Sequence, residues 1–293
     1  MRKFILGTDW WSDCDDAVAV RILARAAKNK EIDLLGIAIN ACMEVSVPSL
    51  ESFLASEGLF DTPIGIDLSA TGFYGRISYQ HALAKSEYAK RSNSDAENAV
   101  KLYRRLLAKA DSKVEIAEIG FLQVVSALLL SEGDEISPLS GYELVQKKVE
   151  RFWVMAGKWD EDGGLEHNFC LNEHTRAAGK EFCELCPVPV TFLGFEIGNT
   201  VITGAGLPET DPLKRVLADH GSAAGRFSWD PMLVLLALTG DEAAAGYDTV
   251  RGTASVDADT GANHFVPDGA ARHAYVVKKQ PDGWYAEQIN SLL

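Results

Sequence analysis

Residues 3–27 read KFILGTDWWSDCDDAVAVRILARAA, and they decide the fold because they join a strand to a helix through an acidic turn. The apolar run at residues 3–8 predicts a buried strand, and residues 16–27 have the period of an amphipathic helix. Positions 9 to 16 hold four carboxylates: Asp9, Asp13, Asp15 and Asp16. So many like charges in one turn are either fully solvated or gathered around a cation.

Strands and helices alternate along most of the chain. Further buried strands are predicted at residues 33–40, 63–66, 114–119, 151–156 and 188–193, and further helices at 48–60, 95–110, 121–131, 173–185, 211–219 and 231–238. This alternation predicts an α/β fold, with an open, mostly parallel central sheet and helices on both faces. On the helix at 95–110 we place Asn98, Lys101 and Arg104 on the polar face.

The last part of the chain has a different character. Between residues 248 and 290, β-prone pieces are separated by the turn sequences DADTGAN, VPDG and QPDG. They predict an antiparallel C-terminal appendage beside the main sheet. Because the chain has no internal repeat and no low-complexity linker, we expect residues 1–293 to form a single domain.

The composition bounds the partners and the compartment. A net charge of −14 without a basic stripe argues against binding to a nucleic-acid backbone. No segment has the roughly 20 apolar residues of a membrane helix, and the N-terminus lacks the features of a secretion signal. Five cysteines fit reduced thiols, so we expect a cytoplasmic protein. Cys183 and Cys186 have C-x-x-C spacing without a second pair, which favours buried thiols over a zinc or redox site.

The acidic turn points to a cation. In an open parallel sheet, ligands bind beyond the carboxyl ends of the strands, and Asp9 stands where the first strand ends. The start of the next helix accounts for one or two acids, because its free N–H groups favour negative charge. It does not account for four, which repel one another unless a proton or a cation lies among them. Ca²⁺ and Mg²⁺ both accept carboxylate oxygens, so we predict a divalent cation site.

Four segments resemble the inosine–uridine nucleoside hydrolase family. Residues 8–17, TDWWSDCDDA, are similar to the longer form of its aspartate signature, D-T-D-x-G-x-D-x-D-D-A, but Gly7 replaces the first Asp and Trp11 replaces the Gly. Residues 117–124, AEIGFLQV, resemble its A-L-G-P-L-T-N turn. Residues 166–169, EHNF, resemble its E-F-N segment, and residues 228–233, SWDPML, resemble its H-D-P-L segment.

The resemblance implies the fold of that family and Ca²⁺-dependent hydrolysis of the N-glycosidic bond of a ribonucleoside or related riboside, which releases the base and ribose. It also implies a general base, Asp15, that takes a proton from a metal-bound water. The Ca²⁺ ligands that it implies are Asp9, Asp16, Asp230 and the backbone carbonyl of Gln123.

The same resemblance supplies the ribose contacts and the assembly. Glu166 and Asn168 match the residues that hold the ribose hydroxyls. Asn40 lies near the place of a further ribose-binding Asn, although not in the same register. Members of the family are commonly dimers or tetramers, so we expect a homodimer or homotetramer.

The chain departs from the resemblance at the leaving group. Purine-active members carry a His, thought to protonate the departing base, where this chain has Trp229. Three explanations stay open: a leaving group that needs no acid, as in a nicotinamide riboside; a proton from His167; or slow turnover. Trp229 either stacks on the base or fills the core. Of Trp10 and Trp11, we expect one to line the pocket.

Two other functions are weighed against riboside hydrolysis. The first is a Mg²⁺-dependent phosphohydrolase with a strand-end aspartate as nucleophile, which Gly7 and the lack of a lysine motif disfavour. The second is a non-catalytic or weakly catalytic protein that binds a riboside and Ca²⁺. Trp229 keeps that option open, and Asp15 opposes it because a binding protein needs no base. In each case the partner is a small molecule.

Overall fold

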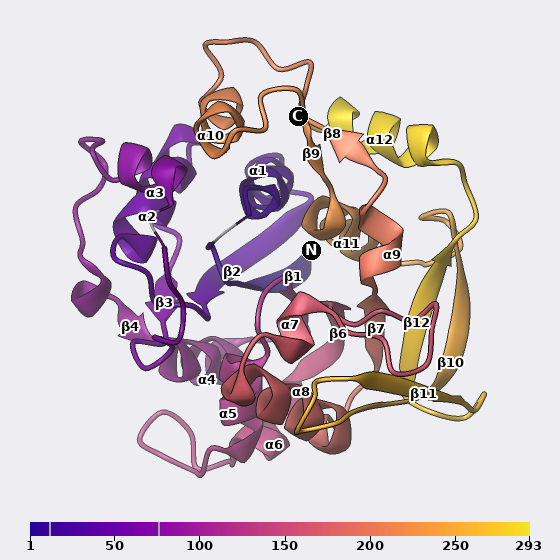
Figure 1. Cartoon of the computed structure of the whole chain (residues 1–293). Coiled ribbons are helices and arrows are strands. Elements are labelled where there is room, and N and C mark those ends of the chain that lie inside the picture. Colours follow the sequence, from indigo (N-terminus) through magenta and orange to yellow (C-terminus); the bar gives the residue numbers. More distant parts are fainter. Residues whose placement is uncertain (12, 76) are drawn as a thin grey trace.

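The centre of the protein is one ten-stranded sheet (Figure 1). The computed structural model describes residues 1–11, 13–75 and 77–293. Along the sheet the strands follow the order β11-β10-β12-β7-β6-β5-β1-β2-β3-β4. Neighbours from β12 to β4 are parallel, and β10 is antiparallel to both β11 and β12. The predicted α/β fold with an antiparallel C-terminal part is confirmed.

Each strand and helix predicted up to residue 238 is observed with bounds shifted by a few residues, and further elements that the sequence did not predict lie between them, among them helices at Ser78–Leu83 and Gly141–Lys148. The strands of the main sheet are β1 (Arg2–Thr8), β2 (Ile32–Ile39), β3 (Ile64–Ile66), β4 (Glu97–Asn98), β5 (Val114–Glu118), β6 (Val149–Met155), β7 (Val190–Leu193), β10 (Tyr247–Val256), β11 (Asn263–Pro267) and β12 (His273–Lys278). A second, two-stranded antiparallel sheet pairs β8 (Ile202–Thr203) with β9 (Arg226–Phe227).

Helices surround the main sheet. They are α1 (Asp15–Lys28), α2 (Ser46–Ser56), α3 (Ser78–Leu83), α4 (Ala99–Lys109), α5 (Gln123–Leu130), α6 (Gly141–Lys148), α7 (His167–Cys170), α8 (Glu173–Leu185), α9 (Phe195–Gly198), α10 (Pro212–His220), α11 (Trp229–Thr239) and α12 (Asp282–Ser291), with a 3₁₀ turn, η1, at Asn93–Asp95. Among the described residues, no helix is both long and apolar enough to cross a membrane.

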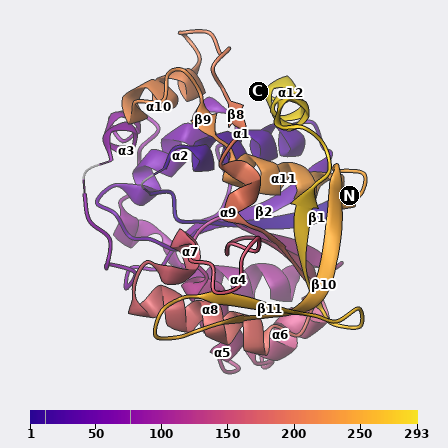
Figure 2. The ribbon, with the colours of Figure 1, turned by 45° about the vertical axis from the view of Figure 1, so that its right-hand side comes forward.

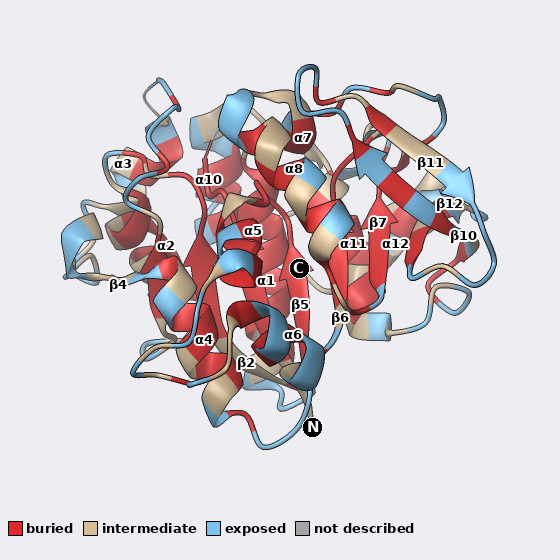
Figure 3. Cartoon of the chain, turned by 90° about the horizontal axis from the view of Figure 1, so that it is seen from below, coloured by how far each residue is buried: buried red, intermediate tan, exposed pale blue. Residues whose placement is uncertain are grey.

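Each face of the sheet has its own hydrophobic core. Helices α1, α2, α10, α11 and α12 contribute to the first core, and α4, α5 and α8 to the second. Figure 1 shows these two groups above and below the strands. In Figure 3 the strands between them are buried, whereas the outer faces of several helices are exposed. The strands are therefore covered on both faces, as parallel sheets usually are.

Strand β1 is the axis of the arrangement. It lies between β2 and β5 and is parallel to both, and its residues from Phe4 to Thr8 are buried. Parallel pairing places the carboxyl ends of neighbouring strands at one edge of the sheet. Helices α1 and α11 pack against each other on one face (Figures 1 and 2). The residues that follow β1 and β5 are thus brought close to the start of α1.

The C-terminal end of the chain differs from the sequence prediction. Residues Asp282–Ser291 form helix α12, where turns and strands were expected. The sequence QPDG begins this helix instead of a reverse turn, with Pro281 as the N-cap residue. Tyr285 and Ile289 are buried in the first core. Tertiary burial of these two side chains, four positions apart, outweighs the local turn signal.

Arg104 is also placed differently from the prediction. It lies on α4 but is only 1% exposed, whereas a position on the polar face was expected. Its guanidinium group donates to both carboxylate oxygens of Asp134 at 2.9 Å and to the carbonyls of Ser137 and Leu139. A buried arginine requires such partners, and a loop some 30 residues away supplies them.

Arg21 ties α1 to its neighbours. Its Nε donates to Glu57 at 2.8 Å, and its guanidinium lies 2.6 Å from Asp211, the N-cap residue of α10. Arg21 is 2% exposed, and the side chain of Glu57 is nearly as buried. This buried ion pair holds the helix whose first turn carries Asp15 and Asp16.

We expect Arg21→Met to lower the free energy of unfolding by about 3 kcal/mol, because the buried Glu57 carboxylate loses its close partner at 2.7 Å and keeps only Arg25 Nε at 3.9 Å. Arg25→Met is the matched control. Its side chain lies one turn further along α1 and is 41% exposed, so we expect a loss below about 1 kcal/mol. Urea denaturation of the two variants measures the difference, and equal losses would contradict this account.

Candidate active site

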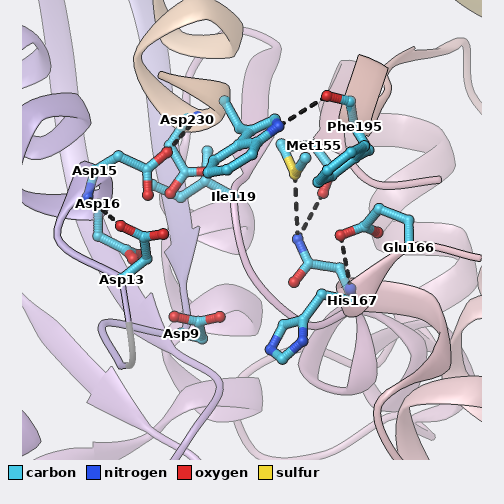
Figure 4. A pocket seen from close by; sticks show the side chains of 12 residues that line it. Asp9, Asp13, Asp15, Asp16, Ile119, Met155, Glu166, His167, Phe195 and Asp230 are labelled. Atoms are coloured by element: carbon cyan, nitrogen blue, oxygen red, sulfur yellow. Dashed lines mark hydrogen bonds between the residues drawn. The ribbon is translucent and has the colours of Figure 1, made fainter. Parts of the chain in front are cut away.

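Segments that are distant in the sequence meet at the carboxyl edge of the sheet. Asp9 follows β1, Ile119 follows β5, and Asp15 and Asp230 lie in the first turns of α1 and α11. Figure 4 shows the acids on one side of a cavity and Glu166 and His167 on the other. The cavity has a volume of about 210 Å³ and is lined by Asp9, Asp13, Asp15, Asp16, Ile119, Met155, Glu166, His167, Asn168, Phe195, Trp229 and Asp230.

Three of the acids converge closely. Carboxylate oxygens of Asp15, Asp16 and Asp230 all lie within 4.8 Å of one another, and all three residues are buried. The Asp230 N–H donates to Asp15 Oδ2 at 3.1 Å, so the start of α11 binds an acid of α1. Asp16 Oδ1 accepts bonds from the Thr8 hydroxyl and the Trp10 amide. Both helix N-termini favour negative charge at this point.

The loop after β1 is held in a constrained conformation. Trp10 has a φ of 46°, in the left-handed region that residues other than glycine rarely adopt. Its indole Nε1 donates to Ser49 Oγ at 2.9 Å, and its carbonyl accepts from the Gln80 side chain. Asp9 in turn accepts the Trp11 N–H at 3.0 Å. These bonds fix the loop, although Ser12 lies outside the described residues.

Burial raises the pKa values of the acids that line the cavity. Burial, together with the nearby Asp15, Asp13 and Glu166, raises the pKa of Asp9 to about 8. The same cause, with repulsion between neighbours, holds the pKa values of Asp15, Asp16 and Asp230 well above their usual range. These four acids therefore ionise together only if positive charge reaches the cavity.

Asp13 behaves differently because it has a cationic partner. Burial by itself raises the pKa of Asp13, but the Arg226 guanidinium outweighs it, and the pKa is lowered overall. Arg226 Nε lies 2.8 Å from Asp13 Oδ1. This arginine comes from β9, 213 positions further along the chain, so no local spacing in the sequence points to it.

The opposite wall carries polar groups that are already oriented. The carboxylate of Glu166 accepts the Asn168 N–H and the Gly157 N–H, both at 2.9 Å. Asn168 Nδ2 donates to the Met155 carbonyl at 2.8 Å. Burial raises the pKa of Glu166 to about 7. The end of β6 thus positions a carboxylate and an amide that face the acids across the cavity.

Aromatic rings complete the lining. Trp229 stacks on Phe195 with ring centres 5.5 Å apart, and its Nε1 donates to the Phe195 carbonyl at 2.8 Å. His167 stacks on Trp11 at 5.8 Å, and burial lowers the pKa of His167. Trp10 is fully buried against α2 and α3, and neither it nor Trp11 lines the cavity. The prediction that Trp10 or Trp11 lines the pocket is therefore wrong, and the tryptophan in the lining is Trp229.

Two of the predicted site residues, Asn40 and Gln123, are not among those that line this cavity. Asn40 is fully buried, and its amide donates to Glu118 and accepts the Phe121 N–H. Gln123 begins α5 and lines a separate cavity with Asn172 and others. Ile119, at the end of β5, lines the acid cavity in its place.

No protein-family model and no curated protein matches the sequence. Solved structures match almost the whole chain. The plant nucleoside hydrolase PpNRh1 is 15% identical, with a TM-score of 0.75 and coverage of 99% of this chain and 98% of that one. The inosine-uridine preferring nucleoside hydrolase from Bacillus anthracis is 14% identical, with a TM-score of 0.71 and full coverage of both chains. The purine-preferring ribonucleoside hydrolase from Gardnerella vaginalis is 17% identical, with a TM-score of 0.70 and coverage of 99% of each chain.

These similarities define the class at the level of the fold. The chain has the nucleoside hydrolase fold, as the sequence resemblance predicted, over its whole length. The acid cavity lies at the carboxyl edge of that sheet, where open α/β sheets bind their ligands.

The raised pKa of Asp9 makes stability depend on pH when cations are chelated. The pKa of Asp9 in the folded protein, about 8, exceeds its pKa in the unfolded chain. The contribution of protonated Asp9 to stability is therefore complete below about pH 4 and is lost as the pH rises towards 8. We therefore expect Asp9→Asn to match the parent at pH 4 and to exceed its unfolding free energy at pH 8, by on the order of 2 kcal/mol. Thermal unfolding in chelator across this range measures the effect.

Asp13→Asn is the control of opposite sign. Its pKa is lowered in the folded state, so its stabilisation is present above the unfolded pKa and is lost as the pH falls. We expect this variant to be less stable than the parent at pH 8. If both substitutions change stability in the same direction at pH 8, the contrast between the paired and the unpaired acids is refuted.

Proposed function

We propose that this protein hydrolyses the N-glycosidic bond of a ribonucleoside or related riboside, with a bound divalent cation, Ca²⁺ by resemblance. One observation carries the proposal: eight of the ten site residues predicted from the sequence line a single cavity in a chain with the nucleoside hydrolase fold. The acids form one wall and Glu166 and Asn168 the other. A ribose bound between them would meet carboxylates on one side and an amide and a carboxylate on the other.

The residues present fit a hard cation. Asp9, Asp16 and Asp230 offer only oxygen donors, which suit Ca²⁺ and Mg²⁺. Their burial and mutual repulsion disfavour ionisation, and a doubly charged ion would offset both. We assign the cation to these three acids and to the carbonyl of Ile119, in place of that of Gln123. When bound, the ion lowers the pKa of a water molecule and orients the ribose hydroxyls.

Asp15 is the proposed general base. Its Oδ2 accepts the Asp230 N–H at 3.1 Å, which leaves the other carboxylate oxygen to take a proton from the attacking water molecule. As Asp15 removes that proton, the water oxygen bonds to C1′ of the ribose, and the leaving group departs with the electron pair of the N-glycosidic bond. Glu166 and Asn168 hold the sugar in line for this attack.

The aromatic residues of the cavity offer little acid catalysis. The Trp229 N–H is already bound to the Phe195 carbonyl. Burial lowers the pKa of His167, so its imidazole is neutral at neutral pH and is a weak proton donor. We therefore infer a preference for ribosides whose leaving group departs without being protonated, and Trp229 would stack on it.

The chemistry is tested with p-nitrophenyl β-D-ribofuranoside, because p-nitrophenolate leaves without an acid. With Ca²⁺ we expect release of p-nitrophenolate that stops on chelation and that falls about 10²- to 10⁴-fold in Asp15→Asn. Calorimetric titration should show that Asp15→Asn still binds Ca²⁺, whereas Asp16→Asn does not.

Two outcomes would change this assignment. No release by a folded, Ca²⁺-loaded protein would refute riboside hydrolysis of this kind. If Asp15→Asn loses Ca²⁺ while Asp9→Asn keeps it, the roles of Asp9 and Asp15 are exchanged, which the close approach of Asp15 to Asp16 and Asp230 also allows.

Trp229→His tests whether a missing acid restricts the leaving group. We expect this variant to raise hydrolysis of inosine relative to that of the p-nitrophenyl riboside by at least about tenfold, since an imidazole can protonate a departing purine. Trp229→Phe keeps a ring but adds no acid, so its ratio should stay at the parent value. An unchanged ratio in both variants would mean that another group already supplies the proton.

A non-catalytic riboside-binding role is the second candidate. The tied indole of Trp229 favours it, because a binding protein requires a stacking surface and no acid. If the protein only binds ribosides, calorimetry in the presence of Ca²⁺ should show riboside binding, and no p-nitrophenolate should be released.

A further inference from the structure

One buried carboxylate takes no part in the proposed chemistry. Glu118, the last residue of β5, is 1% exposed and pairs in register with Gly7 of β1. A Cβ atom at position 7 would overlap the Glu118 carboxylate, so only glycine leaves room for it. Position 7 is where the aspartate signature has its first Asp. Here a carboxylate fills that space from the neighbouring strand.

Two buried side chains bind this carboxylate. The Tyr103 hydroxyl of α4 donates to Glu118 Oε1, and Asn40 Nδ2 donates to Oε2 at 3.5 Å. Both donors are fully buried. Glu118 therefore lies in the interior, directly before the cavity-lining residue Ile119, and its carboxylate accepts the bond from the Asn40 amide.

The orientation of the Asn40 amide matters for the adjacent turn. With Nδ2 directed at Glu118, its Oδ1 accepts the Phe121 N–H at 3.0 Å. If the Asn40 amide were reversed, its NH₂ group would face the Phe121 N–H. Two donors would then meet, and the Phe121 N–H would have no acceptor in the interior. The backbone of Asn40 adds two bonds, from its N–H to the Thr8 carbonyl and from Gln123 Nε2 to its own carbonyl.

The turn that Asn40 holds touches the acid loop. Gly120 lies so close to Asp9 that a Cβ atom on it would overlap the Asp9 backbone nitrogen. The Ile119 N–H, just before it, donates to the Gly7 carbonyl at 2.9 Å. A displacement of this turn therefore moves both Asp9 and the carbonyl of Ile119, which are two of the assigned cation donors.

We propose that Glu118 is a positioning residue for the cation site. Its carboxyl group, supplied by β5 instead of β1, orients Asn40, and Asn40 holds the turn at residues 119–121 against Asp9. The inference rests on the proposed function in one respect, namely that Asp9 and Ile119 contribute to a cation site. It assigns a task to a side chain that touches neither the cation nor the substrate.

Moving the carboxylate between the strands tests this assignment. We expect Glu118→Ala to weaken Ca²⁺ binding about 10- to 100-fold in calorimetric titration. Gly7→Asp alone should fail to bind, because its side chain overlaps Glu118. The double variant Gly7→Asp/Glu118→Ala returns the carboxylate to β1 and should recover Ca²⁺ affinity to within about threefold of the parent.

The conservative variant and a control separate positioning from general stability. Glu118→Gln should bind Ca²⁺ within about threefold of the parent, since its oxygen accepts from Asn40 while its amide donates to the Tyr103 hydroxyl oxygen. Glu115→Gln alters a buried carboxylate of the same strand that binds Arg2 and the Trp153 indole. It should lower the unfolding temperature in chelator and leave Ca²⁺ affinity unchanged.

Three other results would contradict the role of Glu118 or the proposed function. Parent-like Ca²⁺ affinity in folded Glu118→Ala overturns this inference and leaves the proposed function intact. Recovery of stability without recovery of affinity in the double variant also overturns it, because Glu118 would then only support folding. A folded parent protein that binds no Ca²⁺ overturns the proposed function together with the inference.

Discussion

The burial of several carboxylates at one point is the constraint on which the site depends. Each such group loses favourable hydration when it is buried, and neighbours of like charge add to the cost. The fold offsets part of this cost with two helix N-termini, α1 and α11, that face the acids. Specific donors offset a further part, such as the Thr8 hydroxyl on Asp16 and the Asp230 amide on Asp15. What remains uncompensated is negative charge, and this accounts for the raised pKa values of the acids.

The same constraint explains why Trp10, next to the acids, is held by several hydrogen bonds. Buried like charges repel one another, so the segments that carry them have to be held in place by bonds to the rest of the fold. Trp10 adopts a left-handed backbone conformation, and the bonds that it donates to Ser49 and Asp16 and accepts from Gln80 hold it there. Its ring packs deep in the core against Phe53. Trp10 therefore anchors the loop in the core, and the tryptophan that lines the cavity, Trp229, comes from another segment.

Sequence reasoning predicted what is local and missed what is distant. The β1–α1 unit was predicted because a strand buried on both faces is a continuous apolar run and the helix keeps its period. Asp9, Asp15 and Asp16 lie within eight positions of one another, so their convergence also followed. Arg226 was missed because its partner Asp13 is 213 positions away. A backbone oxygen carries no side-chain signal, so the sequence indicates Gln123 by resemblance alone, whereas Ile119, which follows β5, lines the cavity.

At identities of 14–17%, the matching structures share a fold with this chain but few residues. Parallel strands bring the same edge positions together whatever side chains they carry. A group required at one point in space can then come from either of two adjacent strands. Gly7 and Glu118 are register partners, so a carboxylate on β5 reaches the space above β1, provided that β1 gives up its own side chain. Gly7 and Glu118 are thus complementary, because the space that a side chain at position 7 would take is filled by the Glu118 carboxylate.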